Sequence, residues 1–361
     1  MVLVLPDQPG KNLTRPASDL LPQASQAMQR IPQNPTKGPV TGAFRSGPQE
    51  IGCPLSGGSC SRVLTMLLVL LLPALTGCAS NGENQNTPTG GEEEAYVPLP
   101  VRQSEVGSLM LELDKTLKAW QQAVVTNNSV MLRRMESILR NRVNDSFDMV
   151  IEGLESPAPA LRQTAATALG FSGKEQALSP LASALHDPDD RVVANALVGL
   201  GQLASPLSPV SVIAYRLRTS TDQTVRSNAA FALVRIAIND GARDSDSLEA
   251  CRQGLYDDFP AVRGHCASFL GVVMDAQAVP DLASLLLDEV DLVAKPSLLA
   301  LGAIARGEPR ALGEVARALV SAMGKVERPR RAWVRAELSR ISDRDFENDI
   351  NAWTEWAYSL P

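Results

Sequence analysis

Apolar residues recur with the period of an α-helix in five segments between residues 161 and 302. These segments read LRQTAATALG (161–170), VVANALVGLG (192–201), VRSNAAFALV (225–234), VRGHCASFLG (262–271) and VAKPSLLALG (293–302). Within each, the first residue is Leu or Val, the fifth is small and the ninth is an apolar Leu. Offsets of 0, 4 and 8 lie on one face of a helix. Each segment therefore predicts a helix with one apolar face.

This pattern recurs every 31 to 37 residues, which is typical of a helical solenoid. A shorter expected helix and an acidic turn precede each segment. The shorter helices are expected at 148–154, 180–185, 212–218, 249–255 and 280–287. Acidic residues at the start of a helix accept bonds from its free N–H groups and complement its dipole. We therefore expect five pairs of helices stacked side by side.

The flanking segments are helical in pattern but lack the repeated register. Residues 104–125 and 129–143 predict a helix pair, and we expect residues 104–146 to form an N-terminal cap, because a terminal repeat must present a polar outer face. Residues 311–341 predict a looser pair that extends the repeats over 147–341. The last stretch, 342–361, contains Trp353 and Trp356, and we expect it to fold over the last repeat as a lid.

The composition fits a helical stack, with 44% hydrophobic residues but only 4% aromatic ones. The net charge is −6 for the whole chain. Without residues 1–78, 28 basic and 37 acidic residues remain, close to −9. Nucleic-acid binders need a basic surface that displaces counterions. We therefore expect no nucleic-acid partner.

The N-terminal region follows other rules. Residues 1–61 are rich in Pro, Gly, Ser and Gln and lack apolar periodicity, which predicts disorder. Arg62 then precedes an apolar run, 63–75, which is too short to span a bilayer and has the length of a signal-peptide core. The run ends in Leu75-Thr76-Gly77-Cys78.

These four residues resemble the lipobox of bacterial lipoproteins, in which Leu and two small residues precede a Cys. The resemblance implies that residues 62–77 are a signal peptide, that signal peptidase II cuts between Gly77 and Cys78, and that a diacylglyceryl group is attached to the Cys78 thiol. The residue after the Cys is Ala79 and not Asp. By the sorting rule of bacterial lipoproteins, this implies export onward to the outer membrane. We accordingly expect a protein of the bacterial cell envelope that is anchored to a membrane by lipid.

A signal peptide normally begins a chain, yet residues 1–61 precede this one. Either the true start lies near Val63, Leu64 or Met66 and residues 1–61 are an over-extended gene start, or the extension is genuine. After the signal peptide, residues 78–103 lack apolar periodicity and predict a flexible tether that starts at Cys78. About 25 residues of such a chain span roughly 25–30 Å root-mean-square.

A helix, an acidic turn and the pattern V-R-x-x-A-x-x-A-L-G resemble the bacterial HEAT-repeat family, including the type found in phycobilisome lyases. The resemblance covers residues 147–302, with a weaker continuation to about 340. It implies an all-α fold, a right-handed α-solenoid of HEAT-like helix pairs. It also implies that the Arg in second position, present as Arg162, Arg226 and Arg263, pairs with an acid of its own or the next turn, for example Asp222 or Asp258. The alternative is a basic ladder for an acidic ligand.

Cys251 and Cys266 both occupy apolar positions of the pattern, so we expect their sulfurs to point inward and lie close together. A disulfide between them is one interpretation in an oxidising envelope, and two small core residues are the other. His265 lies beside Cys266, but adjacent helical residues diverge by about 100° and do not form a nucleophile–base pair. His186 stands among Asp187, Asp189 and Asp190, which we interpret as helix-capping acids rather than a cation site.

The C-terminal region offers one alternative to the lid. Arg331 and Arg335 together with exposed Trp353 and Trp356 would form a surface for a protein partner.

No catalytic, phosphate-binding or metal-binding motif is recognisable, so we expect no enzyme, cofactor, metal or small-molecule substrate. The leading hypothesis is a lipid-anchored scaffold that binds an unknown protein, because solenoids expose long concave surfaces. The first alternative, by analogy of fold, is a chromophore-lyase-like, bilin-binding activity, which would need a solvent-reachable Cys, Tyr or His on the concave wall. The second is a nucleic-acid-binding HEAT protein, which would need a positive concave face.

Overall fold

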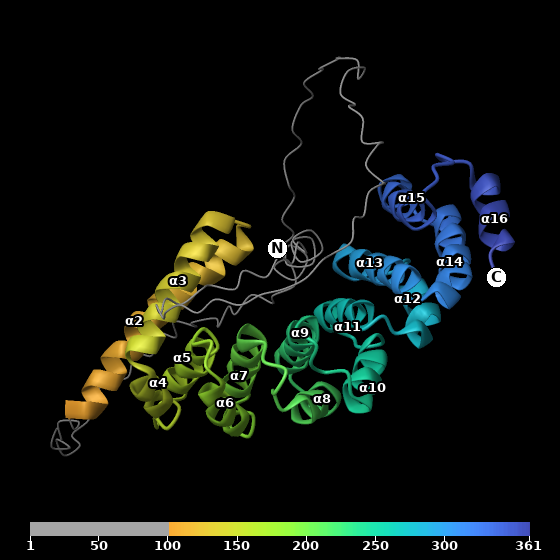
Figure 1. Ribbon diagram of the computed structural model, residues 1–361. Coiled ribbons are helices and arrows are strands. Elements are labelled where there is room, and N and C mark those ends of the chain that lie inside the picture. The colour runs from red at the N-terminus through yellow and green to blue at the C-terminus, as the bar shows by residue number, and fades with distance from the viewer. Residues whose placement is uncertain (1–100) are drawn as a thin grey trace, which may run out of the picture. The chain divides into compact units, whose positions relative to one another are not determined.

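The computed structural model describes residues 101–361, and these form an all-α solenoid, as the periodicity predicts (Figure 1). No strand occurs within this range. Four predictions lie outside the described residues, namely the N-terminal extension, the signal peptide, lipidation of Cys78 and the tether up to residue 100.

Five helix pairs follow the repeated pattern, each with a first and a second helix. The first helices are α4 (Phe147–Gly153), α6 (Leu178–Ala184), α8 (Val210–Thr219), α10 (Ser245–Gly254) and α12 (Val279–Leu285). The second helices are α5 (Pro159–Leu169), α7 (Asp190–Leu203), α9 (Gln223–Ile238), α11 (Pro260–Val272) and α13 (Asp291–Gly307). Short 3-10 turns lead into α6, α12 and α14, at η1 (Glu175–Ala177), η2 (Ala276–Ala278) and η3 (Pro309–Ala311).

The second helices stack on one another in chain order, from α5 through α7, α9 and α11 to α13. The ninth residue of each segment is completely buried, as one apolar face requires, at Leu169, Leu200, Leu233, Leu270 and Leu301. Small residues allow the backbones to approach closely. A Cβ placed on Gly199 of α7 would lie only 2.3 Å from the carbonyl oxygen of Ala166 on α5. The stack thus depends on glycine at the helix contacts as well as on leucine in the core.

The N-terminal cap consists of α2 (Val101–Val125) and α3 (Ser129–Asp145). Helix α2 begins three residues before the expected cap and packs against α3, α4 and α5. Its Trp120 is buried edge-to-face against Phe171, with ring centroids 5.3 Å apart. This long helix closes the apolar face of the first repeat.

At the other end, α14 (Leu312–Lys325) and α15 (Arg328–Ser342) form the looser pair, and α16 (Ile350–Ser359) packs against α14. Trp353 of α16 is fully buried, with ring centroids 4.8 Å from Phe346 and 5.8 Å from Trp356. Its indole N–H donates to the carbonyl of Glu347 at 3.1 Å. The C-terminal segment therefore covers α14, which is the arrangement expected of a lid.

Among residues 101–361, no helix is both long and apolar enough to cross a membrane.

Candidate functional site: a groove between the cap and the second helices

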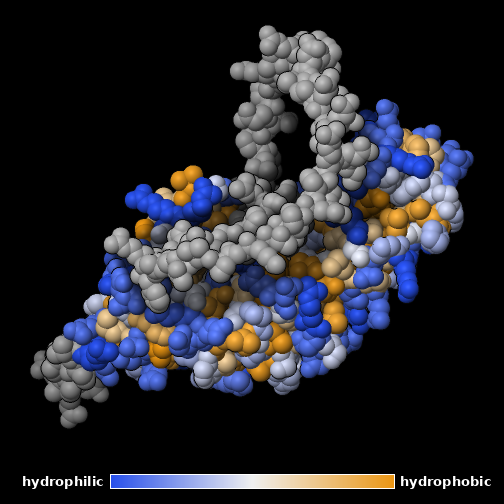
Figure 2. Space-filling model, in the orientation of Figure 1, coloured by the Kyte–Doolittle hydropathy of each residue, from blue (hydrophilic) through white to orange (hydrophobic). Residues whose placement is uncertain are grey.

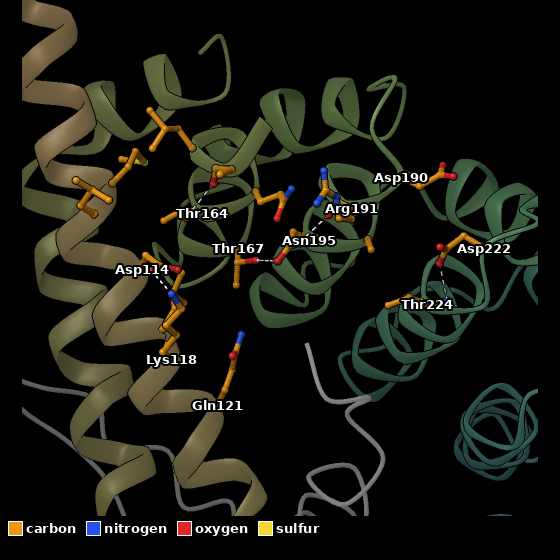
Figure 3. A pocket seen from close by; sticks show the side chains of 17 residues that line it. Asp114, Lys118, Gln121, Thr164, Thr167, Asp190, Arg191, Asn195, Asp222 and Thr224 are labelled. Carbon is orange, nitrogen blue, oxygen red and sulfur yellow. Dashed lines mark hydrogen bonds and ion pairs between the residues drawn. The ribbon is translucent and has the colours of Figure 1, made fainter. Parts of the chain in front are cut away.

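A groove of ≈ 500 Å³ runs between the long cap helix α2 and three successive second helices. It receives side chains from α2, α5, α7 and the start of α9 (Figure 3). Neighbouring packed helices lie about 8–10 Å apart, so the distance from α5 to α9 is about 16–20 Å. An extended peptide rises about 3.3 Å per residue and would cover this distance with about five or six residues.

One part of the groove is apolar. Leu111 of α2, which is 60% exposed, and the half-buried Leu161 of α5 line this part. Buried Met110 and Leu117 lie behind them in the core. An exposed leucine in a concavity offers an apolar contact that water does not satisfy. This part of the groove suits an apolar side chain.

Amide side chains line the middle. The Thr167 hydroxyl of α5 donates to Asn195 Oδ1 of α7 at 2.7 Å, and Asn195 Nδ2 donates to the carbonyl of Arg191 at 2.7 Å (Figure 3). These bonds fix the Asn195 amide and leave one of its N–H groups without a partner among the described residues. The side chains of Gln121 and Gln163 also line the groove and make no hydrogen bond with any described residue. The groove thus presents amide donors and acceptors of the kind that pair with a peptide backbone.

Carboxylates line the end nearest α9. Asp222 caps α9 by accepting from the N–H groups of Thr224 and Val225, at 2.7 and 3.0 Å. Asp190 is exposed in the first turn of α7 and has no cationic partner among the described residues. The remaining charges are matched locally, because Lys118 pairs with Asp114 at 2.6 Å and Arg191 with Asp189 at 2.9 Å. The groove therefore carries a surplus of negative charge at this end.

Beside the groove, the repeated arginines connect successive repeats. Arg162 Nε and Nη2 contact the two carboxylate oxygens of Asp187 at 2.7 and 2.9 Å, and Arg226 contacts Asp257 in the same way at 2.6 and 3.0 Å. Arg263 pairs with Asp288 at 2.8 Å. The guanidinium of Arg162 lowers the pKa of the Asp187 carboxyl by hydrogen bonding.

This geometry confirms the structural interpretation of the arginines, with one correction. Each arginine pairs with the first acid of the next repeat's turn, whereas Asp222 and Asp258, the acids named as examples, are not the partners. Asp222 is occupied as the α9 cap. The arginines are held in ion pairs between repeats, so they do not form a ladder for an acidic ligand.

One junction lacks such a pair. Val193 of the second repeat stands where three other segments have the pairing arginine. Ser220, in the turn of the third repeat, stands where three other turns have the pairing aspartate. Both the cation and the anion are thus replaced at the same junction. Side chains of the third repeat bond to backbone carbonyls of the second instead, with Asn228 Nδ2 donating to Ala194 at 3.0 Å and Arg216 donating to Leu185.

The predicted site residues of the fourth repeat are all buried. Cys251 and Cys266 are free thiols with no exposed surface, as their positions in the pattern predict. Burial raises the pKa of the Cys251 thiol, and hydrogen bonding between the two thiols adds to this. His265 is also fully buried beside Ser227, and burial lowers its pKa to about 4. None of these three side chains reaches solvent, so they offer nothing to a bilin.

The other predicted clusters are structural. Asp187 binds Arg162 and Asp189 caps α7, whereas Asp190, the third acid beside His186, lies exposed in the first turn of α7. The described residues contain no group of His, Cys, Asp and Glu that fits a metal ion. The alternative to the lid, an exposed partner surface, does not match the structure. Trp353 and Trp356 belong to the lid helix α16, and both are buried, so they do not form an exposed pair. Arg335 is held by Asp345 at 2.6 Å, and Arg331 is half-buried.

Sequence reasoning missed the groove, because it lies between segments that are far apart in the chain. Its only local signal is the presence of polar residues such as Gln163, Thr167 and Asn195 on otherwise apolar second helices. The position of α2, which forms the opposite wall, has no counterpart in the repeated pattern.

Comparisons with known proteins agree with this fold. A model of HEAT repeats matches residues 147–234 and 210–302, so this part of the chain consists of HEAT repeats. No curated protein matches the chain in sequence.

Solved structures with similar arrangements include a designed armadillo repeat protein, which is 17% identical (TM-score 0.39), the match covering 55% of this chain and 99% of that chain. A second is the complex of CpcE and CpcF of phycocyanin lyase from Nostoc sp. PCC7120, at 18% identity (TM-score 0.36), covering 76% and 100%. A third is a Kap121p mutant, at 15% identity (TM-score 0.49), covering 67% and 29%. At these identities the likeness concerns the fold alone.

Proposed function

We propose that this chain is a protein-binding scaffold of the bacterial cell envelope, and that the groove between α2 and the second helices holds an extended segment of its partner. The observation that supports this is the order of chemistry along the groove. Apolar Leu111 and Leu161, the amides of Gln163 and Asn195, and the acidic end at Asp190 match an apolar side chain, a peptide backbone and a basic side chain.

The groove favours this function over the two alternatives. A nucleic-acid partner needs a positive surface, whereas the unmatched charge in the groove is negative. A bilin-binding activity needs a solvent-reachable Cys, Tyr or His on the concave wall, whereas the residues that line the groove include none of these, and Cys251, Cys266 and His265 are buried. A scaffold needs only a long surface with ordered polar and apolar contacts, which this groove provides.

The groove is tested with a library of fluorescent six-residue peptides and the purified chain. Bound peptides are expected to carry Leu, Met or Val near one end and Lys or Arg near the other. Asp190→Asn should weaken their binding about 3- to 10-fold, because it removes the unmatched charge at the edge of the groove. Asp258→Asn, which changes another exposed acid in the turn before α11, is the matched control and should leave affinity unchanged. Equal losses in both variants, or a bound set without basic residues, would contradict the proposal.

We further propose that a lipid on Cys78 holds the scaffold at a membrane. The support is the resemblance of Leu75-Thr76-Gly77-Cys78 to a lipobox directly behind the apolar run 63–75. In cells fed radiolabelled palmitate, the chain should be labelled and found with membranes, and Cys78→Ala should be unlabelled and released, because the thiol is the attachment point. Cys251→Ala should remain labelled. Equal labelling of Cys78→Ala would refute the anchor without affecting the groove.

A further inference from the structure

The solvent-facing side of α3 carries no exposed acidic residue over most of its length, although the protein as a whole is acidic. Every exposed residue from 125 to 141 is apolar, basic or uncharged, and the acid within this stretch, Glu136, is half-buried. The fourth arginine of α3, Arg142, is held in an ion pair by Glu112 at 2.8 Å. Three exposed arginines have no ion-pair partner among the described residues, namely Arg133, Arg134 and Arg140. The exposed charge of this surface is therefore entirely positive.

Large apolar side chains share the same surface. Val130 is 70% exposed, Ile138 42% and Met131 39%, and Val125 at the end of α2 adjoins them in the chain across a short turn. Figure 2 shows apolar residues gathered beside strongly hydrophilic ones at the tip of the α2–α3 pair. Exposed apolar groups cost free energy in water unless something covers them. A helix with arginines and large apolar residues on one exposed half has the composition of helices that lie in a membrane interface.

We propose that this surface of α3 docks onto a bilayer that contains anionic lipid. The arginines would pair with the headgroups while Val130, Met131 and Ile138 enter the boundary of the acyl chains. An acidic protein segment is the less favoured occupant, because α3 has its packing contacts with α2, α4 and α5 on its inner side and offers a convex surface outside. A convex helix fits a deformable lipid surface better than it fits a peptide, which needs a groove.

The chain between Cys78 and α2 is long enough for α3 to reach a membrane that holds Cys78. This point rests on the proposed lipid anchor. The chain between Cys78 and Val101 spans at most about 80 Å when fully extended. Helix α2, with 25 residues, is about 37 Å long, so the tip of α2 and α3 lies within reach of an anchored Cys78. The charge and apolar complementarity of α3 do not depend on the anchor.

The test uses the chain from residue 78 onward with Cys78→Ala, so that neither lipid nor the apolar run of residues 63–75 binds the vesicles. The described core extends from Val106 to Ala357, so this chain retains it. Flotation with vesicles of phosphatidylcholine that contain phosphatidylglycerol as the minor component should carry the protein upward, and vesicles of phosphatidylcholine alone should not. Added salt should weaken the binding, because the attraction is electrostatic.

The decisive variant combines Arg133→Gln, Arg134→Gln and Arg140→Gln. With about one kcal/mol for each basic residue near an anionic surface, the partition coefficient should fall on the order of 100-fold. The matched control removes three exposed arginines elsewhere, by Arg218→Gln, Arg310→Gln and Arg344→Gln, and should keep most of the binding. For the apolar part, Ile138→Ser should weaken binding and Leu207→Ser, which changes an exposed leucine outside the cap, should not.

Three outcomes overturn the proposal. These are equal binding to both kinds of vesicle, equal loss in the two triple variants, and binding to soluble poly-glutamate without binding to vesicles, which would assign the surface to an acidic protein. Palmitate labelling tests the anchor at Cys78 independently of the vesicle experiment. Failure of the docking surface therefore remains distinguishable from failure of the anchor.

Discussion

At the scale of single residues, position in the repeat decides what a side chain with reactive chemistry does. Cys266 fills the small fifth position of its segment, and Cys251 fills a core position of α10. Both could be placed inward from the sequence alone, because the apolar period fixes which face of a helix is buried. Whether neighbouring thiols are bonded depends on their geometry, and the structure holds both as free thiols.

His265 gives the clearest prediction at this scale. Burial lowers its pKa to about 4 from the ordinary 6.5, so the folded chain keeps it neutral while the unfolded chain takes up a proton first. The contribution of neutral His265 to the stability of the folded chain is therefore fully present above pH 6.5 and is lost as the pH falls toward 4. The free energy of unfolding should decrease by about 3 kcal/mol over this range.

Urea denaturation at several pH values measures this effect. His265→Gln should flatten the dependence between pH 6.5 and 4.5, whereas His186→Gln, which changes the exposed histidine of a turn, reports the effect of losing a surface imidazole. If His265→Gln keeps the full dependence, the buried imidazole is not its origin.

At the scale of the element, the sequence determines which segments are helical and leaves their contacts open. The five second helices appear where the register predicts them, because a strong 3.6-residue period selects both the structure and its buried face. Four of the first helices begin within two residues of their expected starts, and α10 is the exception. It begins at Ser245, where Asp244 caps it, although its apolar period only becomes regular several residues later.

Glycines at helix contacts provide the test at this scale. In Gly199→Ala the new Cβ would lie 2.3 Å from the carbonyl oxygen of Ala166, so α5 and α7 must separate, and the free energy of unfolding should fall by about 3 kcal/mol. Gly107→Ala is the matched control, since nothing lies within 4 Å of its Cβ and it stands inside α2. It should stabilise the chain by about 0.5–1 kcal/mol through helix propensity. Thermal and urea unfolding measure the free energy of unfolding of both variants, which should fall in Gly199→Ala and rise in Gly107→Ala. An equal change in the two variants would contradict the close contact of α5 and α7.

At the scale of the whole molecule, the repeats form a framework and the two ends carry what is specific to this chain. The solenoid follows from the repeated pattern. The resemblance to HEAT repeats implies that the arginines pair with acids of their own or the next turn, and the structure shows that the acids of the next repeat are the partners. The groove does not follow from the pattern, because its walls belong to α2 and to three second helices that lie much further along the chain. Nothing in the local sequence tells that α2 lies beside these helices. Of the two interpretations of the last stretch, the structure shows the lid and not the exposed tryptophan pair, because α16 packs against α14 and buries Trp353 and Trp356.

The central claim is that the groove between α2 and the second helices holds a protein partner. The most direct measurement places a photo-crosslinking amino acid at position 163 in the groove and, separately, at exposed position 176 in η1, in cells that express the full chain. Irradiation should give a discrete adduct from position 163 and none from position 176, and Asp190→Asn should reduce the adduct at position 163. Equal adducts at both positions, or an adduct at position 176 alone, would contradict the account.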